Sequence, residues 1–336
     1  MSLSASSNSA HSASAAAASV AASSAVGRQA FGPLLCLALA GVLWGAGGLA
    51  GTLLGTVSGL SPLGVATVRL LAGGVLLVAF RMAARRTQLP RGRAAWARIA
   101  IAGLLGGGFQ AAYFLSISLS SVSLATLITI GGTPVIVHVA ELVMGRQRPE
   151  RSSLITLAVA LAGLALLIGL PGGGHSQAAL LASAGFALLS AAGFAALTLI
   201  GASPVPGLDD LAMTGYGSLL GGLALLPLAL AVGDTAGGGL VFRASAQSFG
   251  LVAGLGIGPT ALAYVLYYRG LRSASPTTAA LITLIEPLTA AILGTAILGD
   301  HLGLAGIAGA TLLGASVLRT VWASRRATPT PTPAHE

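Results

Sequence analysis

Residues Gly258 to His301 read GPTALAYVLYYRGLRSASPTTAALITLIEPLTAAILGTAILGDH. Two apolar segments flank a basic turn in this stretch, and Glu286-Pro287 lies inside the second segment. A carboxylate is costly in a hydrocarbon layer, and a proline removes one backbone hydrogen bond from a helix. This pair therefore indicates a special position in an otherwise apolar helix.

The composition around this stretch is that of a membrane protein. The chain has 336 residues, of which 55% are hydrophobic and 7% charged, with a mean hydropathy of +0.90. Soluble domains carry about 25% charged residues, so lipid must surround most of this chain. The sequence predicts an all-α polytopic membrane protein with ten transmembrane helices, near residues 31–53, 62–80, 97–116, 122–144, 153–171, 178–200, 210–232, 247–268, 277–298 and 302–322.

The basic residues report orientation. All seventeen are arginine and the net charge is +9, which in a soluble protein would suggest nucleic acid. Here they cluster in alternate connections between spans, and cytoplasmic loops retain arginine. We therefore expect a cell (inner or plasma) membrane protein with both termini cytoplasmic and no nucleic-acid partner. Two loops depart from this pattern: Arg243 falls in a connection predicted outside, and the loop between spans six and seven carries Asp209 and Asp210.

A weak internal repeat sets the architecture. The segment from Ala112 to Val135 aligns with that from Ala263 to Leu288 through Ala-Tyr, the serines of the turn and a helix proline. Spans three and four thus correspond to spans eight and nine, so the repeat unit has five helices. An odd unit reverses its orientation in the membrane, which predicts two inverted repeats. The expected units are a disordered Ser/Ala-rich cytoplasmic tail at 1–29, repeats at 30–172 and 177–322, and a disordered tail at 323–336.

The residues also resemble a known family. The stretches LWGAGGLAG and SPLGVATVRLLAGGVLL in the first two spans, followed by the stretch quoted above, are similar to the EamA family of the drug/metabolite transporter superfamily. The resemblance covers about residues 31 to 322. It implies a carrier of small metabolites, amino-acid-like compounds or drugs. The sequence departs from the family pattern after span four, where Gly145-Arg146 lacks the usual acid, and after span nine, where Gly299-Asp300 replaces Gly-Glu.

Two charges are predicted deep in the bilayer. Arg69 lies about 10 Å from one surface and Glu286 about 14 Å from the other, at 1.5 Å per residue. In a core about 30 Å thick their heights differ by about 6 Å, and an unpaired charge there costs about 2.5–3.5 kcal/mol. Either the two form a permanent ion pair that fixes helix packing, or they face a watery cavity and bind substrate or protons.

His138 and Glu141 share one face of span four near its cytoplasmic end. Such a pair can relay protons, because imidazole titrates near neutrality, or it can sit at the wet rim of an inner gate. A zinc site needs more ligands than these two, and the single Cys36 excludes a cysteine cluster and an intramolecular disulfide. We expect no metal and no cofactor.

Further candidates are prolines and polar or aromatic residues of the spans. The helix prolines Pro134, Pro259 and Pro287 are either flex points beside the substrate path or static kinks. Tyr267 and Tyr268 are interpreted as anchors at the membrane interface. The residues expected to line a substrate cavity are Trp44, Arg69, Gln110, Tyr113, Tyr264 and Glu286.

These features favour a secondary carrier. The sequence carries no P-loop, no GxSxG and no Rossmann fingerprint, so an ion gradient or the substrate's own gradient would drive transport. We expect export by alternating access, with protons as a candidate coupling ion and a homodimer as an open alternative to a monomer. The alternatives are a passive channel, or an intramembrane enzyme that uses Glu286 or the pair His138 and Glu141 as acid and base.

Overall fold

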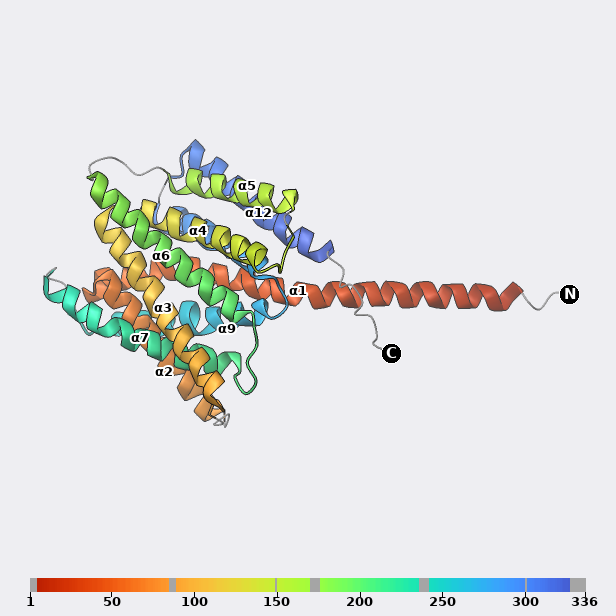
Figure 1. Cartoon of the computed structure of the whole chain (residues 1–336), viewed down its shortest axis with the longest axis horizontal. Helices are drawn as coiled ribbons and strands as arrows, with labels where there is room; N and C mark the ends of the chain where they lie inside the picture. The colour runs from red at the N-terminus through yellow and green to blue at the C-terminus, as the bar shows by residue number, and fades with distance from the viewer. Residues whose placement is uncertain are drawn as a thin grey trace.

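The computed structural model of the chain describes residues 5–84, 89–148, 150–169, 176–235, 242–299 and 301–326. Within this part all regular secondary structure is helical. Figure 1 shows a bundle of roughly aligned helices from which the N-terminal part of α1 projects. The elements are α1 (Ala5–Ser58), α2 (Pro62–Ala83), α3 (Arg93–Leu119), α4 (Val122–Val143), α5 (Arg151–Ile168), α6 (Gln177–Gly201), α7 (Asp210–Thr235), α8 (Ala246–Leu255), the π-helical η1 (Gly256–Leu262), α9 (Ala263–Leu271), α10 (Pro276–Ile282), α11 (Ile285–Leu293), the π-helical η2 (Gly294–Leu298) and α12 (Leu304–Arg326).

These elements confirm the fold class. In the described residues, ten segments are long and apolar enough to cross a membrane, because α8, η1 and α9 form one span and α10, α11 and η2 form another. Large apolar side chains such as Leu104, Leu189 and Val143 are exposed on the outside of the bundle. In water this would be unfavourable, whereas in lipid such side chains meet a matching solvent. The protein is a multi-pass membrane protein.

Serine residues start many of the spans. Ser61, Ser121, Ser176, Ser245 and Ser275 each accept a hydrogen bond from the backbone N–H three residues on. This N-cap satisfies one of the free donors at a helix start, which is why short serine-containing turns are enough to separate the spans.

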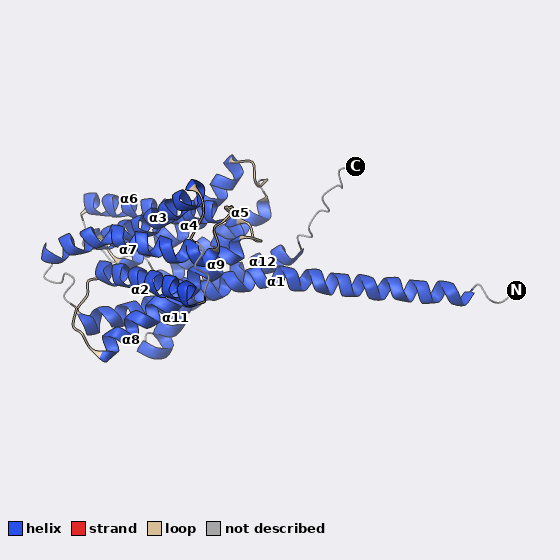
Figure 2. Cartoon of the chain, turned by 90° about the horizontal axis from the view of Figure 1, so that it is seen from below, coloured by secondary structure: helices blue, strands red, loops and turns tan. Residues whose placement is uncertain are grey.

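The first helix differs from the sequence expectation. Composition predicts a disordered tail over residues 1–29, but α1 is continuous from Ala5 and leaves the bundle in both views (Figures 1 and 2). Serine and alanine bury little surface, which favours disorder, but alanine is also the strongest helix former, which favours a helix. At the other end, α12 extends to Arg326, and residues 327–336 of the expected C-terminal tail lie outside the described residues.

The two halves pack on each other with a two-fold pattern. Helix α2 packs along α7, and α5 along α12, so the second and the fifth helix of each half meet their own counterparts. Likewise α3 packs on α6, while α9, its counterpart in the second half, packs on α1. This exchange is what two inverted five-helix repeats produce.

Small residues at the seam between α2 and α7 bring the two backbones together. A Cβ on Gly74 would lie 2.7 Å from a side-chain carbon of Leu219 and 2.9 Å from the carbonyl oxygen of Gly215. Reciprocally, a Cβ on Gly222 would lie 2.8 Å from side-chain carbons of Leu71. Both contacts are too short for any larger residue, so these glycines set the spacing of the two halves.

The ends of the bundle are distinguished by charge. Helices α2, α4, α6 and α9 end, and α3, α5, α7 and α10 begin, at the end that we call the arginine-rich end; its described arginines include Arg81, Arg98 and Arg272. The projecting part of α1 and the last turn of α12 leave the bundle on this same side (Figures 1 and 2).

Candidate functional site

The helix of span nine is broken beside Glu286. Helix α10 ends at Ile282 and α11 begins at Ile285. Pro287 has no N–H to donate to the carbonyl of Thr283, and instead the backbone N–H of Glu286 donates to that carbonyl over 2.9 Å. The break places Glu286 in the first turn of α11, near mid-bundle. Its counterpart Pro134 behaves differently, because α4 runs through it without interruption.

The Trp44-Gly45 pair joins this break to a second irregular helix. The indole N–H of Trp44 donates to the carbonyl oxygen of Pro259 in η1, at 3.0 Å. A Cβ on Gly45 would lie 2.5 Å from the carbonyl oxygen of Glu286, so glycine lets α1 lie directly against α11. The two residues therefore hold α1 against the irregular parts of spans eight and nine, where each proline has removed a backbone donor.

Arg69 and Glu286 lie in the same region but are not hydrogen-bonded to each other in the described part of the chain. The Nη2 of Arg69 donates to Oε1 of Gln110 over 2.6 Å, and Nε2 of Gln110 donates to the carbonyl of Gly106 over 2.9 Å. Arg69, Tyr113 and Tyr264 lie near enough to Glu286 for long-range electrostatic interaction. The described part of the chain thus contains no direct ion pair between Arg69 and Glu286, which was one of the two arrangements expected from the sequence.

Tyr113 and Gln110 come from α3 and are held in place. The hydroxyl of Tyr113 is 2.6 Å from Oγ1 of Thr126 in α4, and Gln110 is 3% exposed. Tyr113 in the first half and Tyr264 in the second half thus both lie in the neighbourhood of Glu286.

An aromatic cluster packs on the other side of Trp44. The ring of Trp44 contacts Tyr264, Tyr267 and Phe194 with centroids 5.2, 5.1 and 5.8 Å apart. The hydroxyl of Tyr267 is 2.6 Å from Oγ1 of Thr198. The interpretation of Tyr267 and Tyr268 as interface anchors is wrong, since they are 0% and 4% exposed and lie inside the bundle. Both tyrosines are near the end of a span, but they lie on the face of the helix that points into the bundle, and this face determines their burial.

A cavity lies next to this cluster, towards the arginine-rich end. Its free volume is about 20 Å³, which is room for about one water molecule. Of the residues expected to line a cavity, only Tyr264 does so here. The lining residues are Leu70, Ala102, Gly106, Leu197, Met213, Thr214, Gly217, Ser218, Gly221, Tyr264 and Tyr268.

His138 and Glu141 are both buried, at 3% and 2% exposure, rather than placed at a wet rim. Oε2 of Glu141 accepts the backbone N–H of Thr277 and the side-chain N–H of Gln147, each at 2.9 Å. Glu141 in α4 thereby caps the start of α10 in the other half, where a negative charge is favoured. Among the described residues both ring nitrogens of His138 lack a hydrogen-bond partner, so no direct hydrogen bond joins His138 to Glu141.

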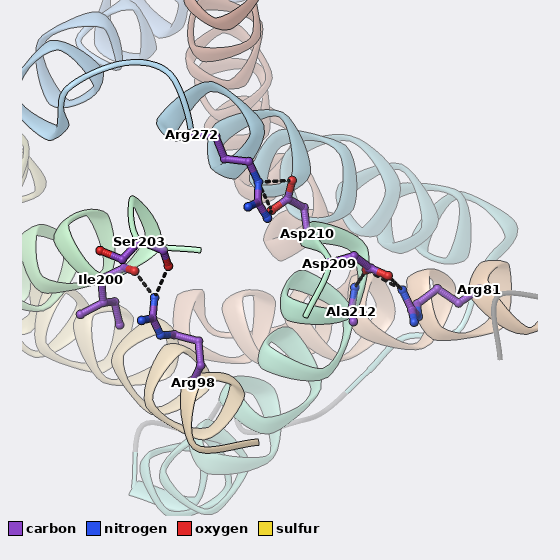
Figure 3. Close-up of polar contacts among 8 residues, drawn as sticks. All are labelled: Arg81, Arg98, Ile200, Ser203, Asp209, Asp210, Ala212 and Arg272. Atoms are coloured by element: carbon purple, nitrogen blue, oxygen red, sulfur yellow. Dashed lines mark hydrogen bonds and ion pairs between the residues drawn. The ribbon is translucent and has the colours of Figure 1, made fainter. Parts of the chain in front are cut away.

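Three arginines hold the connection between α6 and α7 at the arginine-rich end (Figure 3). Nη1 of Arg81 in α2 contacts both carboxylate oxygens of Asp209 at 2.5 and 2.6 Å. Arg272, just after α9, forms an ion pair with Asp210. That hydrogen-bonded carboxylate raises the pKa of Arg272 above its ordinary value.

The third arginine binds the backbone of the same connection. Arg98 in α3 donates to the carbonyl of Ile200 and, over 3.0 Å, to that of Ser203 (Figure 3). We call these three arginines and the two aspartates the arginine clasp. From the sequence these arginines indicate only the orientation of the spans. The adjacent acids Asp209 and Asp210, in loops that otherwise carry arginine, are the sequence feature that indicates ion pairs.

In the described part of the chain, no three His, Cys, Asp or Glu side chains are grouped to hold a metal ion. The arrangement is instead two opposite charges, a carboxamide and tyrosine hydroxyls, between irregular helices inside an apolar bundle. Buried ionisable groups of this kind mark substrate or ion pathways in membrane proteins.

Inverted repeats around charges inside a helical membrane protein are a common architecture of membrane transporters. Comparison with known proteins agrees. The EamA-like transporter family matches residues 31–169 and 181–322, and the chain belongs to this family. It is thus a membrane transporter of the drug/metabolite type, which contacts lipid and a small-molecule substrate.

The chain also resembles individual proteins, of which two are described here. The protein called "Uncharacterized transporter YwfM" from Bacillus subtilis (strain 168) is 26% identical over 273 residues, which span 80% of this chain and 86% of that protein. A protein of known crystal structure matches with a TM-score of 0.69 and 19% identity, over 86% of this chain and 97% of its own. At that identity the second likeness concerns the fold alone.

Proposed function

We propose that this transporter is a secondary carrier that exports small amino-acid-like metabolites across the cell membrane by alternating access. The observation that carries the proposal is the position of Glu286 in the helix break of span nine, without an ion pair to Arg69, whose guanidinium donates to Gln110 instead. A carboxylate and a guanidinium that are close but unpaired suit a zwitterion, whose amine and carboxylate complement them.

Proton exchange would use the same carboxylate. Glu286 reaches no hydrogen-bond donor of Arg69, because that arginine is turned to Gln110. A carboxyl group in such a place can lose its proton to one side and regain it from the other as the carrier reverses. Glu286 is therefore our candidate for proton coupling, and the buried, capping Glu141 is assigned to the gate at the arginine-rich end together with His138.

The orientation follows from the arginines. Cytoplasmic loops retain arginine, so the arginine-rich end is proposed to face the cytoplasm, and with it both termini. The arginine clasp then closes the cytoplasmic end in this conformation, and its ion pairs would separate when the carrier opens inward. Pro259 and Pro287, which lie in the irregular parts of spans eight and nine, remain the proposed flex points, whereas Pro134 in the continuous α4 is proposed to be static.

Transport into proteoliposomes tests the proposal. Proteoliposomes that contain wild-type protein and are loaded with unlabelled L-threonine should take up labelled L-threonine by counterflow. The uptake rate should saturate with substrate concentration and vary with pH. Glu286→Gln should lose the pH dependence and most of the flux. The matched control is Glu150→Gln, because Glu150 is exposed and its side chain caps no backbone donor. Unchanged flux and pH dependence in Glu286→Gln would sink the role of Glu286, and unsaturable flux without counterflow would indicate a channel.

A further inference from the structure

The last turns of α12 carry an arginine on the outer surface of the bundle. Helix α12 packs along α5, and the two helices lie together at the edge of the bundle (Figure 1). The outward face of α12 is apolar, since Leu304 and Leu318 are 88% and 72% exposed. Arg319 follows Leu318 in the helix and is also exposed. Its backbone therefore belongs to a surface that faces lipid.

Arg319 lies inside the membrane span rather than beyond it. The apolar span of α12 runs from Leu304 to Ser324, towards the arginine-rich end. At 1.5 Å per residue, the Cα of Arg319 is about 7 Å inside the end of this span. Trp322 is 55% exposed and lies between Arg319 and that end. Exposed tryptophans of membrane proteins gather at the level of the lipid headgroups, so Arg319 starts on the hydrocarbon side of that level.

The fold offers Arg319 no anionic partner among the described residues. The ion pairs in this part of the chain belong to the arginine clasp, and Arg319 is not a member of it. Its polar neighbours Ser316 and Thr320 are buried and donate their hydroxyls to carbonyls of α12 itself. A guanidinium in hydrocarbon is unfavourable, and a long arginine side chain avoids it by extending to the interface. The guanidinium of Arg319 is therefore expected at the depth of the lipid phosphates.

The neighbouring end of α5 is also basic. Arg148 and Arg151 are exposed there, and the exposed Glu150 between them is the acid of this group, so one positive charge remains in excess. At the opposite ends of α5 and α12, the described residues include no arginine or lysine. The positive charge of this helix pair is thus confined to one leaflet. Arginines that gather beside a membrane surface attract anionic lipids.

A second arginine and tryptophan pair has the opposite order relative to the membrane. Arg93 and Trp96 are both exposed at the start of α3, three residues apart like Arg319 and Trp322. Because α3 enters the bundle from the arginine-rich end, Arg93 lies on the aqueous side of its tryptophan. In α12, which runs towards that end, the arginine lies on the hydrocarbon side. Water can therefore solvate Arg93, whereas a lipid headgroup is the anion within reach of Arg319.

From these observations we infer that Arg319 binds the phosphate group of an anionic phospholipid in the leaflet at the arginine-rich end, with Trp322 beside the headgroup. A guanidinium can donate two parallel hydrogen bonds to phosphate oxygens. Phosphatidylglycerol keeps the negative charge of its phosphate, whereas the ammonium group of phosphatidylcholine cancels it. The site lies on the outside of α12, so it does not depend on the substrate, the direction or the proton coupling proposed above.

Lipid titration of the purified full-length protein in a non-ionic detergent tests the site. The measurement is the phosphatidylglycerol concentration that gives half of the maximal rise in unfolding temperature. Wild type should respond to phosphatidylglycerol at a concentration about tenfold lower than to phosphatidylcholine with the same acyl chains. Inorganic phosphate at the same concentrations should not stabilise the protein, because it lacks the acyl chains that hold a headgroup beside α12.

Three variants separate this site from general surface charge. Arg319→Gln keeps a long polar side chain without the charge and should raise the required phosphatidylglycerol concentration at least about tenfold. Arg319→Lys keeps the charge but loses the paired donors, so its value should lie between those of wild type and Arg319→Gln. The matched control is Arg93→Gln, which removes an equally exposed arginine beside a tryptophan and should stay within about twofold of wild type.

Each contrary result overturns the assignment. Equal responses of wild type to the two phospholipids, or an unchanged response in Arg319→Gln, would show that no anionic headgroup binds at Arg319. If Arg93→Gln weakens the response as much as Arg319→Gln, the attraction comes from the overall charge of the surface. Stabilisation by inorganic phosphate equal to that by phosphatidylglycerol would make the site a general anion site. Native mass spectrometry of bound phosphatidylglycerol gives the same comparison for a variant whose unfolding temperature is changed without lipid.

Discussion

Asp209 and Asp210 are neighbours in the sequence but bind arginines of opposite halves of the transporter. Asp209 pairs with Arg81 of α2 in the first half, while Asp210 pairs with Arg272 next to α9 in the second. Figure 3 shows the two carboxylates at the start of α7 directed towards these different helices. The start of α7 is thereby tied to both halves at once.

The two ion pairs should differ in their contribution to stability. The Arg81 side chain is 6% exposed, so Asp209→Asn leaves a buried cation without its carboxylate, and we expect a loss of about 1–3 kcal/mol. Asp210→Asn should cost less than about 1 kcal/mol, because the side chain of Arg272 is 37% exposed. Chemical unfolding in detergent measures both. Asparagine at 209 can still accept the N–H of Ala212, so the cap of α7 is retained and equal losses would contradict the assignment.

The cap that Glu141 places on α10 predicts an order among its variants. Glu141→Gln keeps one acceptor oxygen and loses the charge, whereas Glu141→Leu leaves the N–H of Thr277 unpaired in the interior. We expect the leucine variant to lose about 1.5–3 kcal/mol and the glutamine variant less, as judged from their unfolding midpoints. Glu150→Gln, at an exposed position, serves as the unchanged reference. Equal stability of the leucine variant and wild type would exclude a capping role.

Two glycines of α1 should respond to alanine with opposite sign. At Gly45 a methyl group would meet the backbone of Glu286, so Gly45→Ala is expected to destabilise by about 1–3 kcal/mol and to lower transport. At Gly48 the methyl meets nothing within 4 Å, and Gly48→Ala should stabilise the helix by about 0.5–1 kcal/mol. Thermal unfolding and counterflow of L-threonine measure the two effects. A neutral Gly45→Ala would show that α1 and α11 need not touch.

The prolines of the two halves should also differ in effect. Pro287→Ala restores an N–H that can donate to Thr283, which would close the break and rotate Glu286, so counterflow should fall at least about tenfold. Pro134→Ala changes a helix that is already continuous, and its flux should stay within about twofold of wild type. If both variants transport normally, the proline-induced break is only architectural.

The sequence predicted the scaffold more fully than the site. Apolar runs of span length and the alternation of arginine-rich connections determine a ten-helix fold, because lipid leaves no other way to satisfy the backbone. The break at Pro287 and the position of Glu286 followed from the proline itself. The sequence does not determine which face of each helix is buried. For this reason it predicts Tyr268 at the membrane interface, whereas Tyr268 lines the cavity inside the bundle.

The arginine clasp escaped prediction for a related reason. Arg81, Arg98 and Arg272 have the residue type and position of topology signals, and only packing shows that acids and carbonyls of one connection meet them.

The reciprocal contacts of Gly74 with Leu219 and of Gly222 with Leu71 also fix a correspondence between α2 and α7, residue by residue. In this correspondence the position in α7 that is equivalent to Arg69 of α2 is Gly217. The first half has an arginine at this position, whereas the second half has a glycine, which lines the cavity. The frame is therefore two-fold while the side chains at equivalent positions are not, so the charge of Arg69 has no counterpart in the other half.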